Sequence, residues 1–303
     1  MKYETPINKY NTIKKIGEGT YGEVLHVSTS KKHQNYALKM SRKKEIYKSK
    51  NIKESLILKR LKHNNIIKII DTINDNDNYG IILPLYKMNL YQYIKKQIYI
   101  NHHDTCIILL KISSGLDYLK RNSVIHRDLK PENILLNSLN DIVISDFGIS
   151  IEKRYLECDD IPYKVQTVYY RSPEIFLRSP YNESIDIWSL GCIAYEIYWK
   201  RPLFTKKDPV ELFIEQNVIL KPPPESFLRN YYITYPLYDD IENPSYMILN
   251  SHKIPLSSNY LNIAHNKNKY IIDFVKRCCE WIPSNRITPH ESVKYLKNVQ
   301  KKS

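Results

Sequence analysis

The hydrophobic pattern of this chain changes near Met88, and that change most limits the folds it can adopt. Residues 10–40 alternate apolar and polar side chains and contain many β-branched residues, which predicts three strands. Residues 44–62 place apolar side chains at roughly helical spacing. The polar segment 74–78 predicts a hairpin turn between two further apolar runs. The first 85 or so residues therefore predict a mostly antiparallel sheet with one helix.

After Met88 the pattern is mainly helical. Short apolar pieces near residues 133–136 and 141–148 predict small strands, and the Pro-, Tyr- and Asn-rich residues 221–262 predict irregular structure. The segments of helix length are 89–98, 104–122, 185–199, 209–220 and 269–282. We therefore expect an α+β fold with a small β-rich part at residues 1–86 and a larger, mainly helical part at residues 87–303.

The composition is that of a soluble globular protein, with 42% apolar and 26% charged residues among 303. The net charge of +14 would attract phosphate-bearing ligands, acidic proteins or nucleic acid, or it could reflect a solvated basic surface. The chain has no zinc-finger spacing, RNA-recognition octamer or basic-region zipper. Nucleic acid is therefore not an expected partner.

Cysteine usage and hydropathy both favour an intracellular protein. The five cysteines include no Cys-x-x-Cys pair, which is typical of a reduced protein. The first ten residues lack an apolar signal core, and the longest apolar stretch, Ile187–Trp199, contains Glu196. That stretch is shorter than the roughly 20 apolar residues that span a bilayer. We expect no membrane association and a location in the cytosol, the nucleus or both.

Three of the chain's seven glycines lie close together, as Gly17, Gly19 and Gly22 in the run Ile16–Val24. A glycine kept in a glycine-poor chain usually meets a backbone need. A dinucleotide fingerprint would be followed by a helix, and a Walker loop would end in Gly-Lys-Ser/Thr, whereas here a β-branched strand follows. A glycine loop between two strands is typical of a flap over phosphates, with a plain hairpin turn as the alternative.

Lys39 lies on the strand expected beside this loop, and Glu54 lies on the following helix. The Lys39 ammonium could neutralise α- and β-phosphate oxygens while the Glu54 carboxylate holds it extended. Taken alone, a strand lysine is usually a solvated surface residue, and Glu54 could instead pair with Lys50 at i,i+4 spacing. The pattern predicts a contact between Lys39 and Glu54.

Residues 126–133 carry the strongest chemical pattern, reading His-Arg-Asp-Leu-Lys-Pro-Glu-Asn, and an Asp-Phe-Gly triplet begins thirteen residues after Asn133. Asp128 can orient a hydroxyl and accept its proton, and Lys130 can steady a moving phosphoryl group. Asn133 and Asp146 offer the oxygen ligands that Mg²⁺ prefers. Because phosphoryl transfer depends on positioning and charge neutralisation, this set predicts a phosphoryl-transfer site.

The ordered set of motifs resembles the signature of the eukaryotic protein kinase superfamily. The resemblance covers about residues 10–297 and includes Ser172-Pro173-Glu174, the run Asp186–Gly191 and Arg286. It implies a bilobal protein kinase fold with one kinase domain. It also implies a structural ion pair between Glu174 and Arg286, and it implies that Asp186 ties down the backbone of the catalytic loop.

The resemblance further implies ATP and Mg²⁺ as cofactors, with Mn²⁺ as a substitute, and protein substrates. The positive net charge would suit acidic substrates among them. Leu83 is the implied gatekeeper, and the base edge would meet backbone groups of Pro84 and Tyr86. Pro84 has no N–H, but only its carbonyl is needed there. The implied catalytic residues are Asp128, Lys130, Lys39, Glu54 and Thr167, and the implied metal ligands are Asn133 and Asp146. The implied ATP-binding residues are Ile16, Gly17, Glu18, Gly19, Thr20, Tyr21, Gly22, Val24, Ala37, Lys39, Leu83, Pro84, Tyr86 and Leu135.

Lys130 matches the serine/threonine form of the kinase motif, and Thr167 matches a threonine that contacts the catalytic aspartate and lysine in that form. The stretch Thr167–Glu174 resembles the CMGC group of cyclin-dependent, mitogen-activated and dual-specificity-regulated kinases. In that group the counterpart of Arg171 shapes the pocket for the residue after the phosphoacceptor, often favouring proline. Residues 51–59 lack the cyclin-binding PSTAIRE-type sequence, so a cyclin-type activator is not expected.

The activation loop departs from the pattern of the group. Pro162 stands where an activating phosphothreonine would be, and the loop around it contains no threonine. Asp159 and Asp160 could serve Arg127 as fixed carboxylates, Tyr163 could be phosphorylated, or the aspartates could simply be solvated. We expect activity without an upstream kinase.

Two other functions fit parts of the sequence. A pseudokinase would be expected to have lost Lys39, Asp128, Asn133 or Asp146, and all four are present. A nucleic-acid-binding protein would use the basic clusters at residues 42–53 and at the C-terminus, but neither alternates with aromatic residues as a stacking platform does. An active serine/threonine kinase is the expected function.

Overall fold

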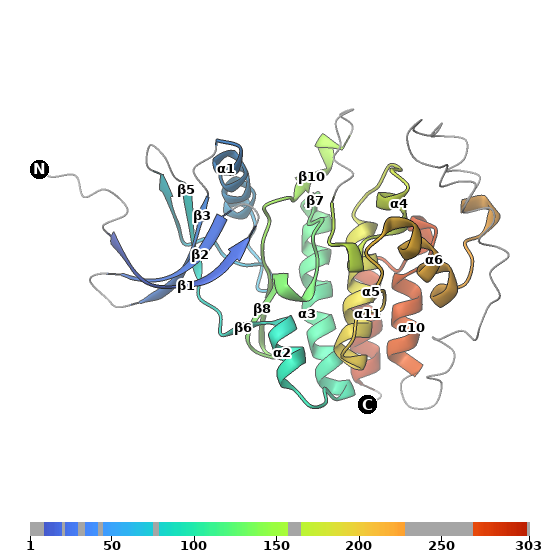
Figure 1. The fold of residues 1–303 in the computed structure, drawn as a ribbon. Coiled ribbons are helices and arrows are strands. Elements are labelled where there is room, and N and C mark those ends of the chain that lie inside the picture. The colour runs from blue at the N-terminus through green and yellow to red at the C-terminus, as the bar shows by residue number, and fades with distance from the viewer. Residues whose placement is uncertain are drawn as a thin grey trace, which may run out of the picture.

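The computed structural model describes residues 9–19, 22–29, 34–41, 45–74, 79–156, 165–227 and 269–301. Its elements divide into a sheet with one helix, which comes first in the chain, and a larger helical part that follows (Figure 1). No helix in these ranges combines the length and the apolar character needed to cross a lipid bilayer.

The N-terminal part is a five-stranded antiparallel sheet with strand order β1-β2-β3-β5-β4. Its strands are β1 (Tyr10–Gly19), β2 (Gly22–Thr29), β3 (Asn35–Ser41), β4 (Asp71–Asn74) and β5 (Tyr79–Pro84). Side chains alternate across the central strand β3, so Leu38 packs with Val27 and Ile82 on one face. Ala37 and Lys39 therefore lie on the other face, which is the face toward the helix.

Helix α1 (Glu45–Arg60) covers that second face of the sheet. Its buried Ile57 and Leu58 join Ile81 and Leu83 of β5 in the main hydrophobic core. Glu54 is also buried, because it lies on the same helical face one turn before these apolar residues. The helix thus brings a carboxylate to the sheet together with its apolar stripe.

The C-terminal part is built around helix α5 (Ser184–Trp199), whose residues from Ile185 to Ile197 are all buried. A helix that is buried on every side needs neighbouring elements on every side. Helix α5 contacts α3 (His102–Arg121) and α10 (Lys269–Cys278), and α3 also contacts α11 (Pro289–Gln300) (Figure 1). The other α-helices with bounds in the described ranges are α2 (Leu90–Lys96), α4 (Pro173–Phe176) and α6 (Pro209–Leu220).

Short strands hold the loops that carry the chemical motifs. Strands β6 (Met88–Asn89), β8 (Ile134–Ser138) and β9 (Asp141–Ile144) form one small sheet, and β7 (Val124–Ile125) pairs with β10 (Ile151–Glu152). The segment 126–133 therefore connects β7 to β8, and the segment 145–150 connects β9 to β10. Because each loop is held at both ends by paired strands, the two loops lie next to each other.

The structure confirms the α+β class with an N-terminal sheet and a helical remainder. The two largest differences from the predicted element boundaries are at β4 and α10. Strand β4 begins only at Asp71, because the residues before it form an irregular segment in which Ile66 and Ile67 are buried and a single bridge joins Ile66 to Ile144. Helix α10 ends at Cys278 instead of continuing to Ile282, the residue before Pro283, where the helical conformation is disfavoured. The expected irregular segment 221–262 lies mostly outside the described residues.

Candidate active site

Asp186, the third residue of α5, holds the start of segment 126–133 through hydrogen bonds to its backbone. Its carboxylate accepts hydrogen bonds from the backbone N–H groups of His126 at 2.8 Å and Arg127 at 3.0 Å. Arg127 has φ 68°, a left-handed conformation that non-glycine residues seldom adopt. Burial raises the pKa of Asp186, while the two N–H groups and the charges of His126 and Arg127 oppose that effect. The resemblance had implied this role for Asp186.

Asp128 lies at the centre of a hydrogen-bonded cluster. Its Oδ1 accepts from the Thr167 hydroxyl at 2.8 Å and the Thr167 backbone N–H at 3.1 Å. Its Oδ2 lies 3.0 Å from Lys130 Nζ and accepts from Asn133 Nδ2 at 3.1 Å. Lys130 also donates to the Thr167 hydroxyl at 2.9 Å. The catalytic loop and the segment at residue 167 thus meet at one carboxylate.

Lys39 of β3 forms a second cluster. Its Nζ lies 2.7 Å from Glu54 Oε2 and 2.6 Å from Asp146 Oδ1. Burial acts to lower the pKa of Lys39, but the charges of Asp146 and Glu54 outweigh it and raise the pKa above its usual value. Burial likewise acts to raise the pKa of Asp146, but the Lys39 ammonium prevails and lowers it to about 2. The pKa of Glu54 is raised by burial against the opposing charge of Lys39.

The Asp-Phe-Gly triplet is positioned by its own backbone and by Glu54. The Phe147 N–H donates to Glu54 Oε1 at 3.2 Å, and the buried Phe147 ring packs edge-on against His126 at 5.0 Å. A Cβ at Gly148 would lie only 3.3 Å from Asp146 Oδ1 and 3.4 Å from Glu54 Oε2, so a side chain there would crowd the cluster. One helix carboxylate therefore binds both the strand lysine and the backbone of this loop.

The space around the backbone differs between Gly17 and Gly22 of the β1–β2 hairpin. A Cβ at Gly22 would come within 1.9 Å of the Met40 carbonyl oxygen, so the close approach of β2 and β3 requires glycine there. A Cβ at Gly17 would meet nothing nearer than Val24 Cβ at 3.6 Å, so the fold alone does not require glycine at that position. Of the predicted ATP-binding residues in this hairpin, Thr20 and Tyr21 lie outside the described residues.

The residues predicted to surround adenine come from the strands β1, β2, β3, β5 and β8 and from the segment after β5. Val24 pairs with Lys39, and Ala37 pairs with Leu83, which puts these side chains on one face of the sheet. Ala37, Leu83 and Leu135 of β8 all belong to or pack against the main core. Ile16 and Glu18 lie exposed on β1, and Pro84 and Tyr86 are half-buried. Burial and the neighbouring Asp141 charge raise the pKa of Tyr86 to about 12.

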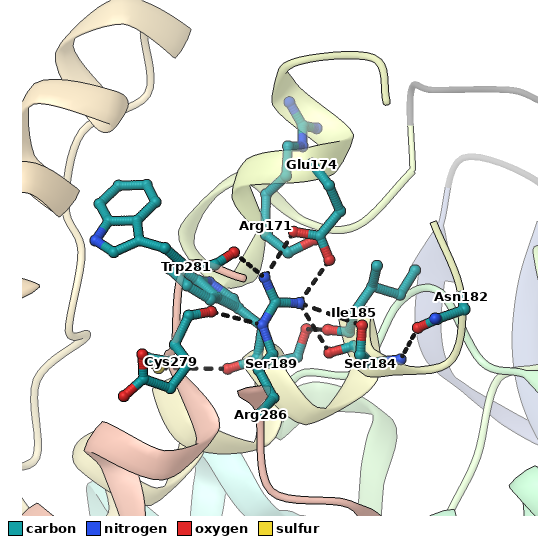
Figure 2. A network of polar contacts seen from close by, with 12 residues as sticks. Arg171, Glu174, Asn182, Ser184, Ile185, Ser189, Cys279, Trp281 and Arg286 are labelled. Atoms are coloured by element: carbon teal, nitrogen blue, oxygen red, sulfur yellow. Dashed lines mark hydrogen bonds and ion pairs between the residues drawn. The ribbon is translucent and has the colours of Figure 1, made fainter. Parts of the chain in front are cut away.

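A buried ion pair holds the segment that follows Thr167 onto the helical part (Figure 2). Arg286 donates to both carboxylate oxygens of Glu174, at 2.5 and 2.7 Å, and neither side chain is exposed to solvent. The guanidinium also donates to the Ser184 carbonyl at 3.1 Å and lies over the Trp188 ring at 5.1 Å. The pair that the resemblance implied is therefore present.

Sequence reasoning missed two residues near these clusters. Tyr181 accepts a hydrogen bond from Arg127 Nη1 at 2.9 Å. The Gln166 amide donates to the Ile185 carbonyl and to the Ser189 hydroxyl, both at 2.9 Å. The only local signal for Gln166 was its place directly before Thr167. The loop residues invoked for activation, Asp159, Asp160, Pro162 and Tyr163, all lie outside the described residues.

Asn133 and Asp146 are the oxygen donors available for a metal bound to a nucleotide. No group of three or more His, Cys, Asp or Glu side chains that could hold a metal ion occurs within the described ranges. Mg²⁺ at phosphate-transfer sites usually takes one or two protein ligands and completes its shell with phosphate oxygens and water. Asn133 and Asp146, held together by the Ser145 N–H that donates to the Asn133 carbonyl at 2.8 Å, fit a metal of that kind.

Comparison with known proteins agrees with this geometry. The model of the protein kinase domain family matches residues 10–296 of the chain. The chain is 32% identical over 300 residues to dual specificity tyrosine-phosphorylation-regulated kinase 2 of Drosophila melanogaster, covering 94% of this chain and 40% of that protein. It is 32% identical over 300 residues to serine/threonine-protein kinase ICK of Mus musculus, covering 95% of this chain and 45% of that protein. It is 30% identical over 296 residues to serine/threonine-protein kinase MAK of Homo sapiens, again covering 95% and 45%. The chain thus spans less than half the length of these relatives.

Proposed function

Because the chain belongs to the protein kinase domain family and is of the CMGC type, we propose that it transfers the γ-phosphate of ATP to serine and threonine hydroxyls of proteins. The names of two of its relatives, both serine/threonine-protein kinases, support this choice of acceptor. The observation that carries the proposal is the cluster at Asp128. A carboxylate that touches both Lys130 and Thr167 is suited to receive a small hydroxyl and its proton.

Three observations support our proposal that ATP binds beneath the β1–β2 hairpin. The backbone at Gly17 has room beside it, which allows close approach of phosphates. Lys39 supplies an ammonium whose raised pKa keeps it charged at neutral pH, and Glu54 holds that ammonium in place. Ala37 and Leu135 supply apolar surface for a base. We propose that the adenine lies between these two side chains and that Leu83 is the gatekeeper.

We propose that Asn133 and Asp146 would hold Mg²⁺, which when bound neutralises phosphate charge. The Asp146 pKa of about 2 means that this carboxylate is ionised at every pH at which a kinase is assayed. Asp128 then orients the substrate hydroxyl and accepts its proton, while Lys130 offsets negative charge on the moving phosphoryl group. The Thr167 hydroxyl bonds both the Asp128 carboxylate and the Lys130 ammonium and so fixes their relative positions.

The backbone near Thr167 favours proline after the phosphoacceptor. Arg171 donates to the carbonyl oxygens of Val165 at 3.1 Å and Gln166 at 2.9 Å, so these acceptors are already used. A substrate residue with an N–H group placed there would lack an acceptor, which is costly in a buried site, whereas proline has no N–H. We therefore propose proline-directed specificity.

We also propose activity without an upstream kinase or a cyclin-type activator. Two of the five N–H donors of the Arg127 guanidinium are already engaged, by the Ile149 carbonyl at 2.7 Å and the Tyr181 hydroxyl at 2.9 Å, so the side chain is held in place before any phosphate binds. The Lys39–Glu54 contact, which must be in place for kinase activity, is made by the chain's own residues.

The proposal is tested by incubating the purified protein with labelled ATP, Mg²⁺ and a generic basic protein, followed by phosphoamino-acid analysis. We expect phosphoserine and phosphothreonine. Phosphotyrosine as the main product would overturn the acceptor class. Tight binding of Mg-ATP without transfer to any protein would instead identify a pseudokinase.

A further inference from the structure

Helix α1, which lies beside the sheet (Figure 1), is bound to it by a buried amide as well as by apolar packing. The Asn51 Nδ2 donates to the Tyr79 carbonyl of β5 at 3.2 Å and lies 3.5 Å from the Lys39 carbonyl of β3. Only 2% of Asn51 is exposed, so its amide is shielded from bulk water. One neutral side chain of the helix therefore reaches two adjacent strands.

Tyr79 is the residue of β5 at which these contacts converge. Its hydroxyl lies 2.8 Å from Ser55 Oγ, and its N–H donates to Ser41 Oγ of β3 at 3.2 Å. The Ser55 hydroxyl gives its one proton to the Ile52 carbonyl at 2.8 Å, so the tyrosine is the donor in that pair. Ser55 lies one helical turn after Asn51 and on the same face. Two successive turns of α1 are thus bound to one buried residue of the sheet.

Asn51 and Glu54 approach the same strand residue from one helix. Glu54 Oε2 lies 2.7 Å from Lys39 Nζ, and the Asn51 amide lies beside the Lys39 carbonyl. The spacing of three residues puts Asn51 and Glu54 on one helix face, which also carries the buried Leu58. A rotation of α1 that moved Glu54 away from the sheet would therefore also break the bond from Asn51 to Tyr79.

Apolar packing brings α1 to the sheet but does not by itself fix its rotation. The hydrophobic effect is non-directional, so Ile57 and Leu58 can stay buried through small rotations of the helix. A hydrogen bond depends on both distance and angle, and a buried carbonyl left without a donor is costly. The bond from Asn51 to the Tyr79 carbonyl therefore disfavours helix positions in which Glu54 does not reach Lys39.

We propose that Asn51 is a positioning residue for phosphoryl transfer, an inference that rests on the kinase activity proposed above. With Tyr79 it holds α1 where Glu54 contacts both the Lys39 ammonium and the Phe147 N–H. Asn51 acts through Glu54 and Lys39 and not on the nucleotide. Because these contacts are made by neutral side chains within the chain, α1 is placed without an activator protein on its outer face.

A purely structural role for Asn51 makes a different prediction. Any buried amide that satisfies a carbonyl stabilises the fold, and its loss would lower activity by the same factor whether or not Glu54 is intact. A positioning role makes the loss depend on Glu54, because the helix position matters only while the carboxylate is present. The deciding measurement is therefore a double-mutant cycle between residues 51 and 54.

The cycle uses the full chain as wild type, Asn51→Leu, Glu54→Gln and the double variant. Asn51→Leu keeps the approximate size of the side chain and removes its donor. Tyr79→Phe removes only a hydroxyl and serves as the second variant if the leucine variant fails to fold. Asn65→Leu is the matched control, because Asn65 is also buried and donates to a backbone carbonyl, that of Ile142 in β9 at 2.9 Å, but lies outside α1.

We expect Asn51→Leu to lower kcat/KM for Mg-ATP, with a generic basic protein as acceptor, about tenfold when Glu54 is present. In the Glu54→Gln background the same change should cost less than about twofold. Tyr79→Phe should show the same dependence on Glu54 with a smaller loss, and Asn65→Leu should cost an equal factor in both backgrounds. Amide hydrogen exchange of residues 47–60 should quicken about tenfold in Asn51→Leu and stay unchanged in Asn65→Leu.

All proteins are compared at a temperature at which circular dichroism shows them folded. Equal losses in the two backgrounds for the folded residue 51 and 79 variants would overturn the inference, as would unchanged exchange in α1. A wild-type protein that transfers no phosphate would refute the kinase assignment, while the exchange measurement still tests the hold on α1. A wild-type kinase with an additive cycle would refute this inference alone.

Discussion

Thr167 shows how one hydroxyl can hold two charged groups in position. It donates to Asp128 and accepts from Lys130, and its own N–H adds a third contact to the same aspartate. A side chain without the hydroxyl would leave the carboxylate and the ammonium to find other partners. The residue therefore determines where the aspartate points, although its own atoms need not touch the phosphate.

Thr167→Val keeps the shape of the side chain and removes the hydroxyl, while Thr167→Ser keeps the hydroxyl. A hydrogen bond to a charged group contributes about 1.5–3 kcal/mol, so we expect kcat/KM to fall by roughly tenfold to a hundredfold in the valine variant. The serine variant should stay within about threefold of the wild type. Steady-state kinetics with one peptide decide the matter, and equal losses in both variants would argue against a role for the hydroxyl.

Asp146 should make stability sensitive to acid. Its folded-state pKa of about 2 lies below the usual 3.8, so the contact with Lys39 stabilises the fold at pH above about 4 and is lost as the pH falls toward 2. The effect is modest because 44% of the Asp146 side chain is exposed and water screens the pair. Thermal unfolding of wild type and Asp146→Asn should differ most at neutral pH and converge near pH 2; a difference that grows in acid would contradict this account.

At the scale of elements, α5 anchors both the catalytic loop and the segment after Thr167. Asp186 holds the loop backbone, and the Ser184 carbonyl helps to hold the buried pair of Glu174 and Arg286 (Figure 2). A fully buried charge is tolerated only when it is paired and hydrogen-bonded. The ion pair therefore connects the α4 segment to the loop before α11, elements that are far apart in the sequence.

Arg286→Met should destabilise the protein strongly, because it leaves the Glu174 carboxylate buried without its partner. The expected loss is about 3–5 kcal/mol in the free energy of unfolding. Adding Glu174→Gln to that variant should recover part of the loss, since the remaining group is then neutral. Urea unfolding of the two variants and the wild type provides the measurement. A double variant less stable than the single one would show that the unpaired Glu174 charge is not the main cause of the lost stability.

The elements themselves were largely predictable from the sequence, and the reason is local. Strand alternation and helical spacing are properties of neighbouring residues, so β1–β3, α1 and α5 appear where the pattern places them. The chemical groups of segment 126–133 lie within one octamer, so their identity was also readable. The contacts of Asp186 and of the Glu174–Arg286 pair came from family resemblance, because no local pattern encodes them.

What the sequence did not reveal depends on tertiary placement. Gln166 is an ordinary polar residue until α5 brings Ile185 and Ser189 to its amide. Gly22 looked like part of a phosphate loop, yet the Met40 carbonyl already excludes a side chain there. The isoleucine-rich run at residues 66–70 resembled a strand, but Ile66 and Ile67 are buried in an irregular segment with one bridge, and Ile70 is exposed. In each case a long-range contact decides what the local pattern leaves open.

At the scale of the whole molecule, the sheet carries Lys39 and the helical part carries Asp128, and the Asp146 loop touches the lysine. The two parts share one hydrophobic core that includes Leu83, Leu109 and Trp188. The shared core and the hydrogen bonds of Arg127 within the chain predict that the active site is assembled without phosphorylation of the loop.

Protein made in a host without protein kinases of this type and then treated with phosphatase should keep its activity within about twofold of the untreated sample. Mass spectrometry of the intact chain verifies that phosphate is absent. The reason is that Ile149 and Tyr181 already engage the Arg127 guanidinium. Activity that disappears on phosphatase treatment and returns with an upstream kinase would contradict the prediction.

The most direct test of the central claim compares wild type with Asp128→Asn in two assays on the same preparations: Mg-ATP binding by calorimetry and phosphate transfer to a generic basic protein. Asp128 is proposed to act on the substrate hydroxyl and not on the nucleotide, so binding should be unchanged while kcat falls by about 10²–10⁴. Equal transfer rates in the two proteins would contradict the claim that this carboxylate receives the proton.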